Sequence, residues 1–253
     1  MSAIDKNFEN DELSRWVREA MDEPAQTVQV DVNSNSDKAQ LLDVNKREIM
    51  LRLIEFKEML MRNACAIKEI RTKLEILNTE YALKHHRNPI HSINTRLKSM
   101  SSIGVKMEKY GKPFNVGSIE ENLHDIAGVR VICPYIDDIY TVADALLKQD
   151  DITYVEKKDY IKKPKPNGYR SLHLIVKVPV FFADGRRDMT VEVQIRTIAM
   201  DFWASLEHKL KYKKEISNAE SISNELYYCA ELINQLDGRM QQIREKIDRT
   251  SEE

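Results

Sequence analysis

Charged, amide and imidazole side chains alternate with apolar residues in three short segments of the chain. The alternating residues are Glu192, Gln194 and Arg196 in VEVQIR, His173 in SLHLIVKV and Arg130 in GVRVIC. Because side chains alternate across a strand, each segment predicts a strand with one apolar and one polar face. A solvated sheet face would explain any one of these rows. If the strands are neighbours, however, the polar groups converge on one concave surface, which is the usual form of a small-molecule site.

Two carboxylates could add metal or acid–base chemistry to that face. Asp125 lies in HDIAGVR, just before one of the predicted strands, and Glu192 lies within another. Such a pair could hold Mg²⁺, and one member could act as a base toward a hydroxyl group. Alternatively, Asp125 caps a turn and Glu192 pairs with a neighbouring arginine. The spacing of the two residues leaves both interpretations open.

Basic residues gather in local clusters, although 39 Lys and Arg against 41 Asp and Glu give the chain a formal charge of −2. This balance excludes a protein that coats nucleic acid through its net field. The clusters lie in TRLKS, SIGVKMEKYGK and KDYIKKPKPNGYRSLH. Lysine and arginine beside serine and glycine suit phosphate oxygens, and a ring presented by the Asn-Gly turn, Tyr169, suits stacking on a base. These features favour a nucleotide polyphosphate as ligand. The sequence contains no P-loop, GxGxxG or protein-kinase motif, so phosphoryl transfer would need another scaffold.

Hydrophobic periodicity predicts the elements that must position these residues. Apolar positions at spacings of three, four and seven indicate one long helix, or two in line, over residues 45–85. Strands are expected at 127–133, 152–157 (an edge strand), 171–178 and 189–197, with ADGRRD as the hairpin turn, and helices at 135–149, 197–213 and 221–248. This order indicates an α/β (α+β) fold, with a mixed sheet of four or five strands, helices packed on it and long helices at both ends.

The N-terminal residues 1–44 are expected to be an extension of this domain. Residues 11–21 place Leu13, Trp16 and Val17 on one face of a short amphipathic helix, and the Pro-, Asn- and Ser-containing stretch that follows is typical of a flexible connector. There is no apolar run of about eighteen residues and no signal-peptide core. Three widely spaced cysteines, an odd number, argue against disulfides and structural zinc, and we expect them to be buried in a reducing, cytoplasmic protein.

Five motifs, in order, resemble the synthetase domain of RelA/SpoT homologues, and in particular the short alarmone synthetases of Gram-positive bacteria in their RelP-like branch. The motifs are TRLKS with a following SI, HDIAGVRVIC, KDYIKKPKPNGYRSLH, VEVQIRT and AMDFWASLEHKLKYK, and the resemblance covers about residues 80–248. It implies a nucleotidyltransferase-like fold, with residues 45–253 as a single synthetase domain. It also implies Mg²⁺-dependent transfer of the β,γ-pyrophosphate of ATP to the 3′-hydroxyl of GDP or GTP, which gives ppGpp or pppGpp and AMP in the stringent response.

The same resemblance implies roles for individual residues. Asp125 would bind Mg²⁺, and Glu192 would bind the metal or deprotonate the attacking hydroxyl. The residues implied for ATP are Arg96 and Arg130, which would sandwich adenine, and Lys98, Ser102, Lys106 and Lys109, which would hold its phosphates. The residues implied for GDP or GTP are Tyr169, which would stack on guanine, and Lys165, His173 and Gln194.

The resemblance further implies a homotetramer without hydrolase activity and without direct dependence on the ribosome. The long helices at 45–85 and 217–249 have more apolar surface than a small sheet can cover, so they form either a subunit interface or an intramolecular helix pair. Two alternative functions remain. One is a nucleotide- or RNA-binding regulator that lost the chemistry, and the other is a pyrophosphokinase with another purine nucleotide as acceptor, because a tyrosine stacks on any purine.

Overall fold

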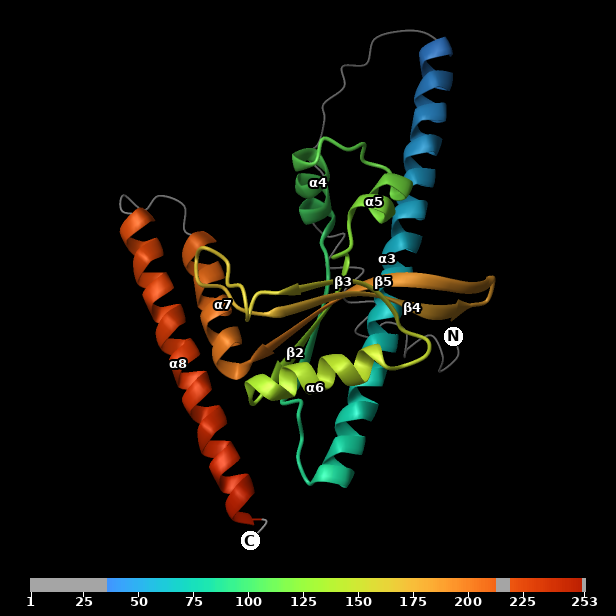
Figure 1. Ribbon diagram of the computed structural model, residues 1–253. Helices are drawn as coiled ribbons and strands as arrows, with labels where there is room; N and C mark the ends of the chain where they lie inside the picture. The colour runs from blue at the N-terminus through green and yellow to red at the C-terminus, as the bar shows by residue number, and fades with distance from the viewer. Residues whose placement is uncertain (1–35, 213–218, 252–253) are drawn as a thin grey trace, which may run out of the picture. The chain divides into compact units, whose positions relative to one another are not determined.

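The computed structural model describes residues 36–212 and 219–251 (Figure 1). The predicted helix at 11–21 and its connector lie outside these residues. In chain order the elements are α3 (Ser36–His85), β1 (Ser92–Leu97), α4 (Met100–Lys109), α5 (Val116–Asn122), β2 (Ala127–Cys133), α6 (Ile136–Leu147), β3 (Thr153–Asp159), β4 (Leu172–Phe182), β5 (Gly185–Thr197), α7 (Ile198–Tyr212) and α8 (Ala219–Ser251). The long predicted N-terminal helix is therefore one continuous helix.

The chain divides into two compact units, and α3 contributes to both. The first unit contains the residues up to Ala66 and Leu97–Ala127, and the second contains Ile67–Arg96 and Gly128–Glu253. In the first unit, the α3 residues Phe56, Met59 and Leu60 pack with apolar side chains of α4, α5 and the segment that follows α5. Each such side chain contributes about 1.5–3 kcal/mol when fully buried. This small core holds α4 and the end of the 97–127 segment in fixed positions.

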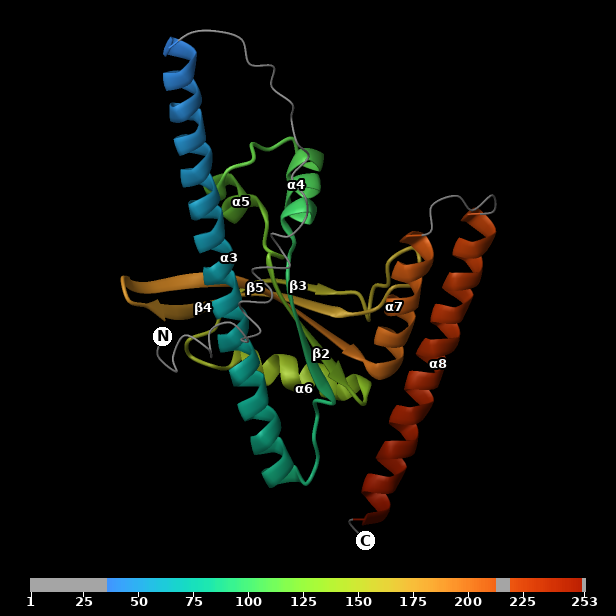
Figure 2. The same ribbon diagram turned by 180° about the vertical axis from the view of Figure 1, so that it is seen from behind.

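The second unit is built on a five-stranded mixed sheet in the order β1-β2-β5-β4-β3. Strands β2 and β5 are parallel, whereas β5, β4 and β3 are successively antiparallel. Figures 1 and 2 show α6 along one face of this sheet and α7 beside α8. The mixed sheet and the edge position of β3 confirm the predictions. Strand β1, over the TRL part of TRLKS, was not predicted.

The hairpin between β4 and β5 differs from the expectation. Phe182 pairs with Gly185, so the turn consists of Ala183 and Asp184 alone, and the rest of ADGRRD continues the ladder. The charged residues misled the prediction because residues 185–188 at the start of β5 are exposed, and arginine and aspartate are tolerated in an exposed part of a strand. Gly185 has φ +127°, a conformation that favours glycine, and it begins β5 directly after the turn.

The apolar faces of the strands form the core of the second unit. Val191, Val193 and Ile195 are fully buried, as the alternation in VEVQIR predicts. The cysteines follow their expectation only in part, because Cys133 is buried, Cys65 is half-buried and Cys229 is exposed. Cys229 lies on α8 between the exposed Tyr228 and the buried Ala230, so it belongs to the solvent-facing side of this helix. No helix within the described ranges is long and apolar enough to cross a membrane.

Candidate active site

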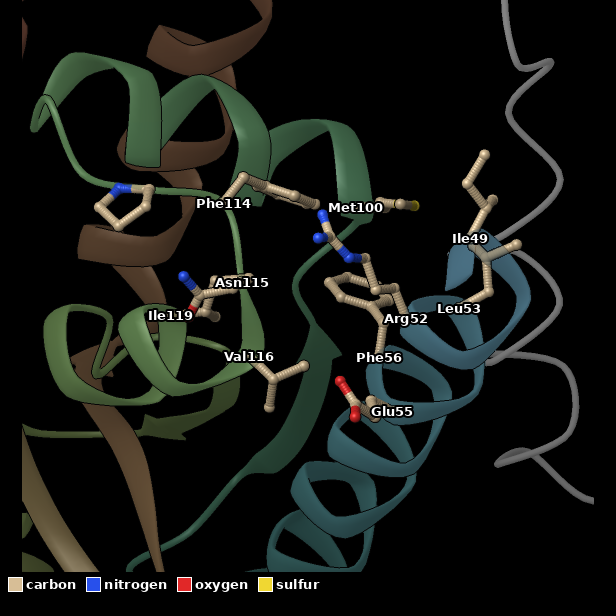
Figure 3. Close-up of a pocket in the computed structure, with 11 residues that line it drawn as sticks. Ile49, Arg52, Leu53, Glu55, Phe56, Met100, Phe114, Asn115, Val116 and Ile119 are labelled. Carbon is tan, nitrogen blue, oxygen red and sulfur yellow. The ribbon is translucent and has the colours of Figure 1, made fainter. Parts of the chain in front are cut away.

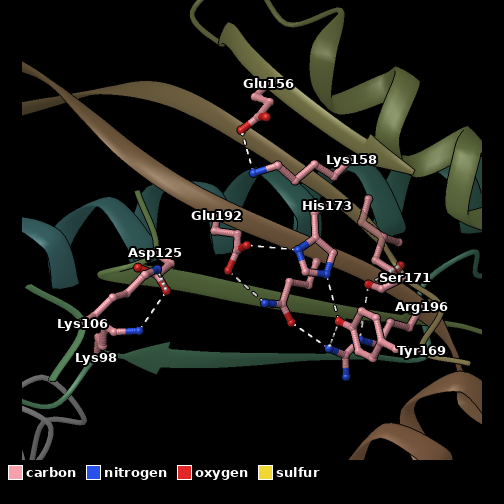
Figure 4. A network of polar contacts seen from close by, with 12 residues as sticks. Lys98, Lys106, Asp125, Glu156, Lys158, Tyr169, Ser171, His173, Glu192 and Arg196 are labelled. Atoms are coloured by element: carbon pink, nitrogen blue, oxygen red, sulfur yellow. Dashed lines mark hydrogen bonds and ion pairs between the residues drawn. The ribbon is translucent and has the colours of Figure 1, made fainter. Parts of the chain in front are cut away.

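Asp125 forms the centre of a basic cluster in the first unit. Its Oδ2 accepts hydrogen bonds from Nζ of Lys98 and Nζ of Lys106, both at 2.8 Å (Figure 4). The backbone brings these residues together, because the amide of Lys98 donates to the carbonyl of Ile126 at 2.9 Å. The Oδ1 atom of Asp125 is buried and has no hydrogen-bond partner. A buried carboxylate oxygen without a partner is costly unless a further group binds it.

The two lysines also determine the charge state of this carboxylate. Burial alone would raise the pKa of Asp125, but hydrogen bonds from Lys106 and Lys98 outweigh burial and hold the pKa below its ordinary value. Asp125 is therefore ionised at neutral pH, as a metal ligand must be. The cluster as a whole retains one net positive charge, which favours phosphate.

Helix α4 carries the other residues that the motifs imply for the phosphates of ATP. Ser99 caps the helix, accepting from the amide of Ser102 at 3.3 Å and donating to the Ser102 hydroxyl at 2.8 Å. Ser102, Lys106 and Lys109 follow each other at intervals of four and three residues, so they lie on one face of α4. Lys106 belongs to the Asp125 cluster, while Lys109 lies in the last turn and is exposed.

The polar row of β5 forms a second cluster, which lies in the second unit. Gln194 Nε2 donates to Glu192 Oε2 at 2.9 Å, and Arg196 Nη2 donates to Gln194 Oε1 at 2.9 Å. On the neighbouring strand β4, His173 Nδ1 lies 3.0 Å from Glu192 Oε1, and its Nε2 lies 2.8 Å from the hydroxyl of Tyr169. The convergence that strand parity predicted for Glu192, Gln194 and His173 is present, and Figure 4 shows His173 beside Glu192.

The loop before β4 places Tyr169 at this cluster. Gly168 has φ +85°, the amide of Gly168 donates to the carbonyl of Lys165 at 2.8 Å, and the Asn167 side chain accepts from the amide of Tyr169 at 3.2 Å. This is the Asn-Gly turn expected from the sequence. Lys165 Nζ lies 4.9 Å from the centre of the Tyr169 ring and 4.7 Å from that of Tyr160, so this predicted acceptor residue is held by cation–π contacts.

The two arginines implied for adenine lie on neighbouring strands, Arg96 on β1 and Arg130 on β2. Arg130 is half-buried, and its guanidinium lies 3.3 Å from Asp201 at the start of α7. Burial, followed by repulsion from Arg196, lowers the pKa of Arg130, while the carboxylate of Asp201 opposes this shift. Asp201 also accepts from Arg196 at 3.1 Å, so one carboxylate orients two arginines.

Arg170, which lies in the basic stretch that suggested phosphate binding, is paired with a carboxylate of the protein itself. Its side chain is buried and lies 2.9 Å from Glu231 of α8, with weaker bonds to the carbonyls of Gly168 and Ala230. It ties the Tyr169 loop to α8. The sequence placed Arg196 on the polar face with Glu192, but no individual role was predicted for it. Asp201 was missed as part of the site, because its pairing depends on the fold of α7.

The first unit also contains a cavity of 480 Å³ (Figure 3). It is lined mainly by apolar side chains of α3 and of the segment from Pro113 to Ile119. The polar residues Arg52, Glu55 and Asn115 also line it. None of the residues that the motifs imply for catalysis or nucleotide binding lines it. The size of this cavity therefore does not identify the substrate site.

The chain is similar in sequence to known GTP pyrophosphokinases. The family described as a region found in RelA / SpoT proteins matches residues 95–217, which contain every predicted site residue. GTP pyrophosphokinase YwaC of Bacillus subtilis is 43% identical over 194 residues, which cover 77% of this chain and 92% of that protein. GTP pyrophosphokinase YjbM of the same organism is 36% identical over 182 residues, 72% of this chain and 85% of that protein.

Solved structures show the same relationship in three dimensions. Small alarmone synthetase 2 of Bacillus subtilis has a TM-score of 0.69 at 42% identity, covering 76% of this chain and 99% of that one. Small alarmone synthetase 1 of the same organism, bound to its product pppGpp, has a TM-score of 0.69 at 35% identity, covering 76% and 98%. These values confirm both the fold class and the resemblance found in the motifs. The chain belongs to the RelA/SpoT family, among its small alarmone synthetases.

Proposed function

We propose that the protein transfers the β,γ-diphosphate of ATP to the 3′-hydroxyl of GDP or GTP, giving ppGpp or pppGpp and releasing AMP. The observation that carries the proposal is the Glu192 cluster. Both oxygens of this carboxylate accept a hydrogen bond from a fixed side chain, and the cluster includes Tyr169, an aromatic ring suited to a purine. A relative with this fold has been solved with its product pppGpp bound.

The first unit supplies groups suited to the donor phosphates. Attack of a hydroxyl on phosphorus needs charge neutralisation and in-line positioning more than covalent catalysis. Lys98 and Lys106 both bind one carboxylate oxygen of Asp125, so one ammonium group could turn toward a phosphate oxygen while the other retains Asp125. Ser102, near the N-terminus of α4, adds a hydroxyl donor.

The second unit supplies groups suited to the acceptor. Gln194 and His173 each hydrogen-bond to one carboxylate oxygen of Glu192, which fixes the orientation of this carboxylate, and a carboxylate oxygen can accept more than one hydrogen bond. We assign Glu192 as the group that accepts the proton of the 3′-hydroxyl. Tyr169 would stack on the guanine, and Lys165, held against that ring, would meet the acceptor phosphates.

For the metal ion we propose Mg²⁺, with Asp125 and Glu192 as its protein ligands, as the motifs imply. The free, buried Oδ1 of an ionised Asp125 fits this role. The described residues contain no group of three or more acidic, histidine or cysteine side chains arranged as a metal site. Mg²⁺ at phosphates commonly uses one or two carboxylates, the phosphates and water. When bound, the ion would neutralise the charge that develops on the transferred group.

We also propose that the protein acts in the cytoplasm as a homotetramer. One face of α8 exposes a stripe of large apolar residues, Tyr228, Leu232, Leu236, Ile243 and Ile247, each 46–64% exposed. Such a stripe on a long helix suits another subunit. Light scattering at micromolar concentration tests this: the wild type should have the mass of a tetramer and Leu236→Lys a lower mass. A monomeric wild-type protein would contradict the proposed tetramer.

The activity itself is tested by incubating the protein with ATP, GDP and Mg²⁺ and separating the products. Equal amounts of AMP and ppGpp are expected. Glu192→Gln should lower kcat by about 10³-fold or more without unfolding the protein, because an amide keeps the shape but cannot accept the proton. Competition among GDP, GTP, GMP and ATP as acceptors identifies the preferred nucleotide. Absence of AMP release by the wild type would refute the proposal.

A further inference from the structure

Five side chains of the second unit form a closed ring of hydrogen bonds that includes Glu192 (Figure 4). One arm runs from Arg196 Nη2 to the Tyr169 hydroxyl at 2.5 Å, on to His173 Nε2 at 2.8 Å, and from His173 Nδ1 to Glu192 Oε1 at 3.0 Å. The other arm runs from Arg196 Nη2 to Gln194 Oε1 and from Gln194 Nε2 to Glu192 Oε2, both at 2.9 Å. The two arms start at one nitrogen and end on the two oxygens of one carboxylate.

The chemistry at the two ends of the ring sets the direction of its bonds. Arginine has only hydrogens to donate, and a carboxylate can only accept. The amide of Gln194 must therefore turn its oxygen to Arg196 and its nitrogen to Glu192. With a neutral imidazole, His173 carries its proton on Nδ1 toward Glu192, and Nε2 accepts the hydroxyl hydrogen of Tyr169.

We propose that Arg196 is a positioning residue for the reaction: it fixes, through Tyr169–His173 and through Gln194, the orientation of the Glu192 carboxylate. This inference rests on the proposed function, in which Glu192 accepts the proton of the acceptor hydroxyl. The ring makes the aromatic platform and the proton acceptor parts of one bonded unit. Seating of a purine on Tyr169 is thereby coupled to the geometry of Glu192.

Arg196 is well placed to anchor the ring because it is itself held from several sides. It is 4% exposed, its Nε donates to Ser171 Oγ at 3.3 Å, and its Nη1 donates to Asp201 at 3.1 Å. Without its guanidinium, the amide of Gln194 can rotate and His173 can move its proton to Nε2, which would then donate to the Tyr169 oxygen. The bare Nδ1 would face the Glu192 carboxylate and repel it.

The role of the hydrogen-bond ring can be tested with substitutions that preserve the aromatic side chain on which the purine would stack. Tyr169→Phe keeps the aromatic ring and removes the hydroxyl, so kcat should fall by about tenfold, the worth of a hydrogen bond, with KM for GDP changed by less than about twofold. Arg196→Lys keeps the charge but loses the planar fork, so kcat should fall by about 10- to 100-fold. The double variant should lose no more than about threefold beyond Arg196→Lys, because the arm through Tyr169 has already lost its anchor.

Matched control variants distinguish the effect of breaking the hydrogen-bond ring from general effects of the same substitutions. Tyr160→Phe removes a hydroxyl from the ring that lies edge-on to Tyr169, and Arg186→Lys makes the same exchange at the exposed start of β5. Both should retain wild-type kcat and KM. Thermal melting reports whether Arg196→Lys folds, and the milder Tyr169→Phe carries the test if it does not.

The outcomes distinguish this inference from the proposed function. If wild type releases AMP but Tyr169→Phe keeps its kcat, or loses only affinity for GDP, the ring has no positioning role and the inference is wrong. A measurement independent of turnover is ¹⁵N NMR of the His173 imidazole, which should carry its proton on Nδ1 in wild type and lose that preference in Arg196→Lys. A wild-type imidazole protonated on Nε2 alone would also overturn the inference, whether or not the protein is active.

Discussion

Gly168 lies close to α8, and replacing it with alanine should perturb the contact between the Tyr169 loop and that helix. A Cβ at this position would lie 2.5 Å from Cβ of Ala230, nearer than two carbon atoms can approach. Its φ of +85° is also unfavourable for alanine. Gly168→Ala should therefore push the loop away from α8 and displace Tyr169.

The loss of folding stability expected for Gly168→Ala has two parts. An L-residue in the left-handed region costs about 1–2 kcal/mol, and overpacking a well-filled contact costs about 1–3 kcal/mol. Gly168→Ala should thus lower the free energy of unfolding by about 2–4 kcal/mol, the sum of these ranges rounded down for local relaxation. Gly111→Ala is the matched control, since Gly111 has φ +61° but nothing within 4 Å of the added Cβ. It should cost about 1–2 kcal/mol, from the backbone alone.

Urea denaturation of the three proteins measures these differences, and the KM values for GDP and ATP report on the site. Gly168→Ala should raise KM for GDP more than KM for ATP. Adding Ala230→Gly removes the clashing methyl, so the double variant should be more stable than the two single changes predict together, by about 1–3 kcal/mol. Equal losses for Gly168→Ala and Gly111→Ala, within about 0.5 kcal/mol, would show that the contact with α8 does not constrain the loop.

Two further predictions concern the carboxylates of Asp125 and Asp138. Asp125→Asn should reduce kcat by about 10³-fold, because Lys98 and Lys106 lose their shared anion and the metal loses a ligand. These lysines lower the pKa of Asp125, so its contribution to the stability of the fold is present above its unfolded pKa and is lost as pH falls through its folded pKa. Urea denaturation below pH ~4 should show this loss in wild type but not in the variant. Burial, opposed by Arg87, raises the pKa of Asp138 to about 6. The folded protein then holds an extra proton between pH ~4 and about 6, so stability should fall as pH rises through that window, by up to about 3 kcal/mol, and Asp138→Asn should flatten this slope. An unchanged slope would contradict the assignment to Asp138.

Strand parity made much of the second cluster predictable. The alternation in VEVQIR placed Glu192, Gln194 and Arg196 on one face, and the structure links these three side chains in a continuous row. Alternation is a local property of the backbone, so a single segment of sequence contains it. The contact between His173 and Glu192 could be predicted only on the further condition that β4 and β5 are neighbours, and a short connection between the two strands favours this.

Contacts between residues far apart in sequence were beyond such reasoning. Arg170 is paired with Glu231 across 61 positions, and Thr197 donates to Asp237 at 2.6 Å across 40. Both depend on where α8 lies against the sheet, and periodicity predicts that a helix has an apolar face but not what covers it. The lysine-rich stretch therefore suggested phosphate binding for Arg170, whereas the structure pairs this arginine with Glu231, which holds the Tyr169 loop against α8.

The Tyr169 hydroxyl shows why a resemblance of motifs and a physical account are both needed. The motif implies a ring that stacks on guanine, a role that phenylalanine or tryptophan could also fill. The structure gives the hydroxyl a separate task, because it accepts from Arg196 and its single hydrogen is directed at His173. A tyrosine is then required by the orientation of Glu192 as much as by the purine. Stacking would determine how well the acceptor binds, and the hydroxyl how well the bound acceptor reacts, so the two contributions should separate into KM and kcat.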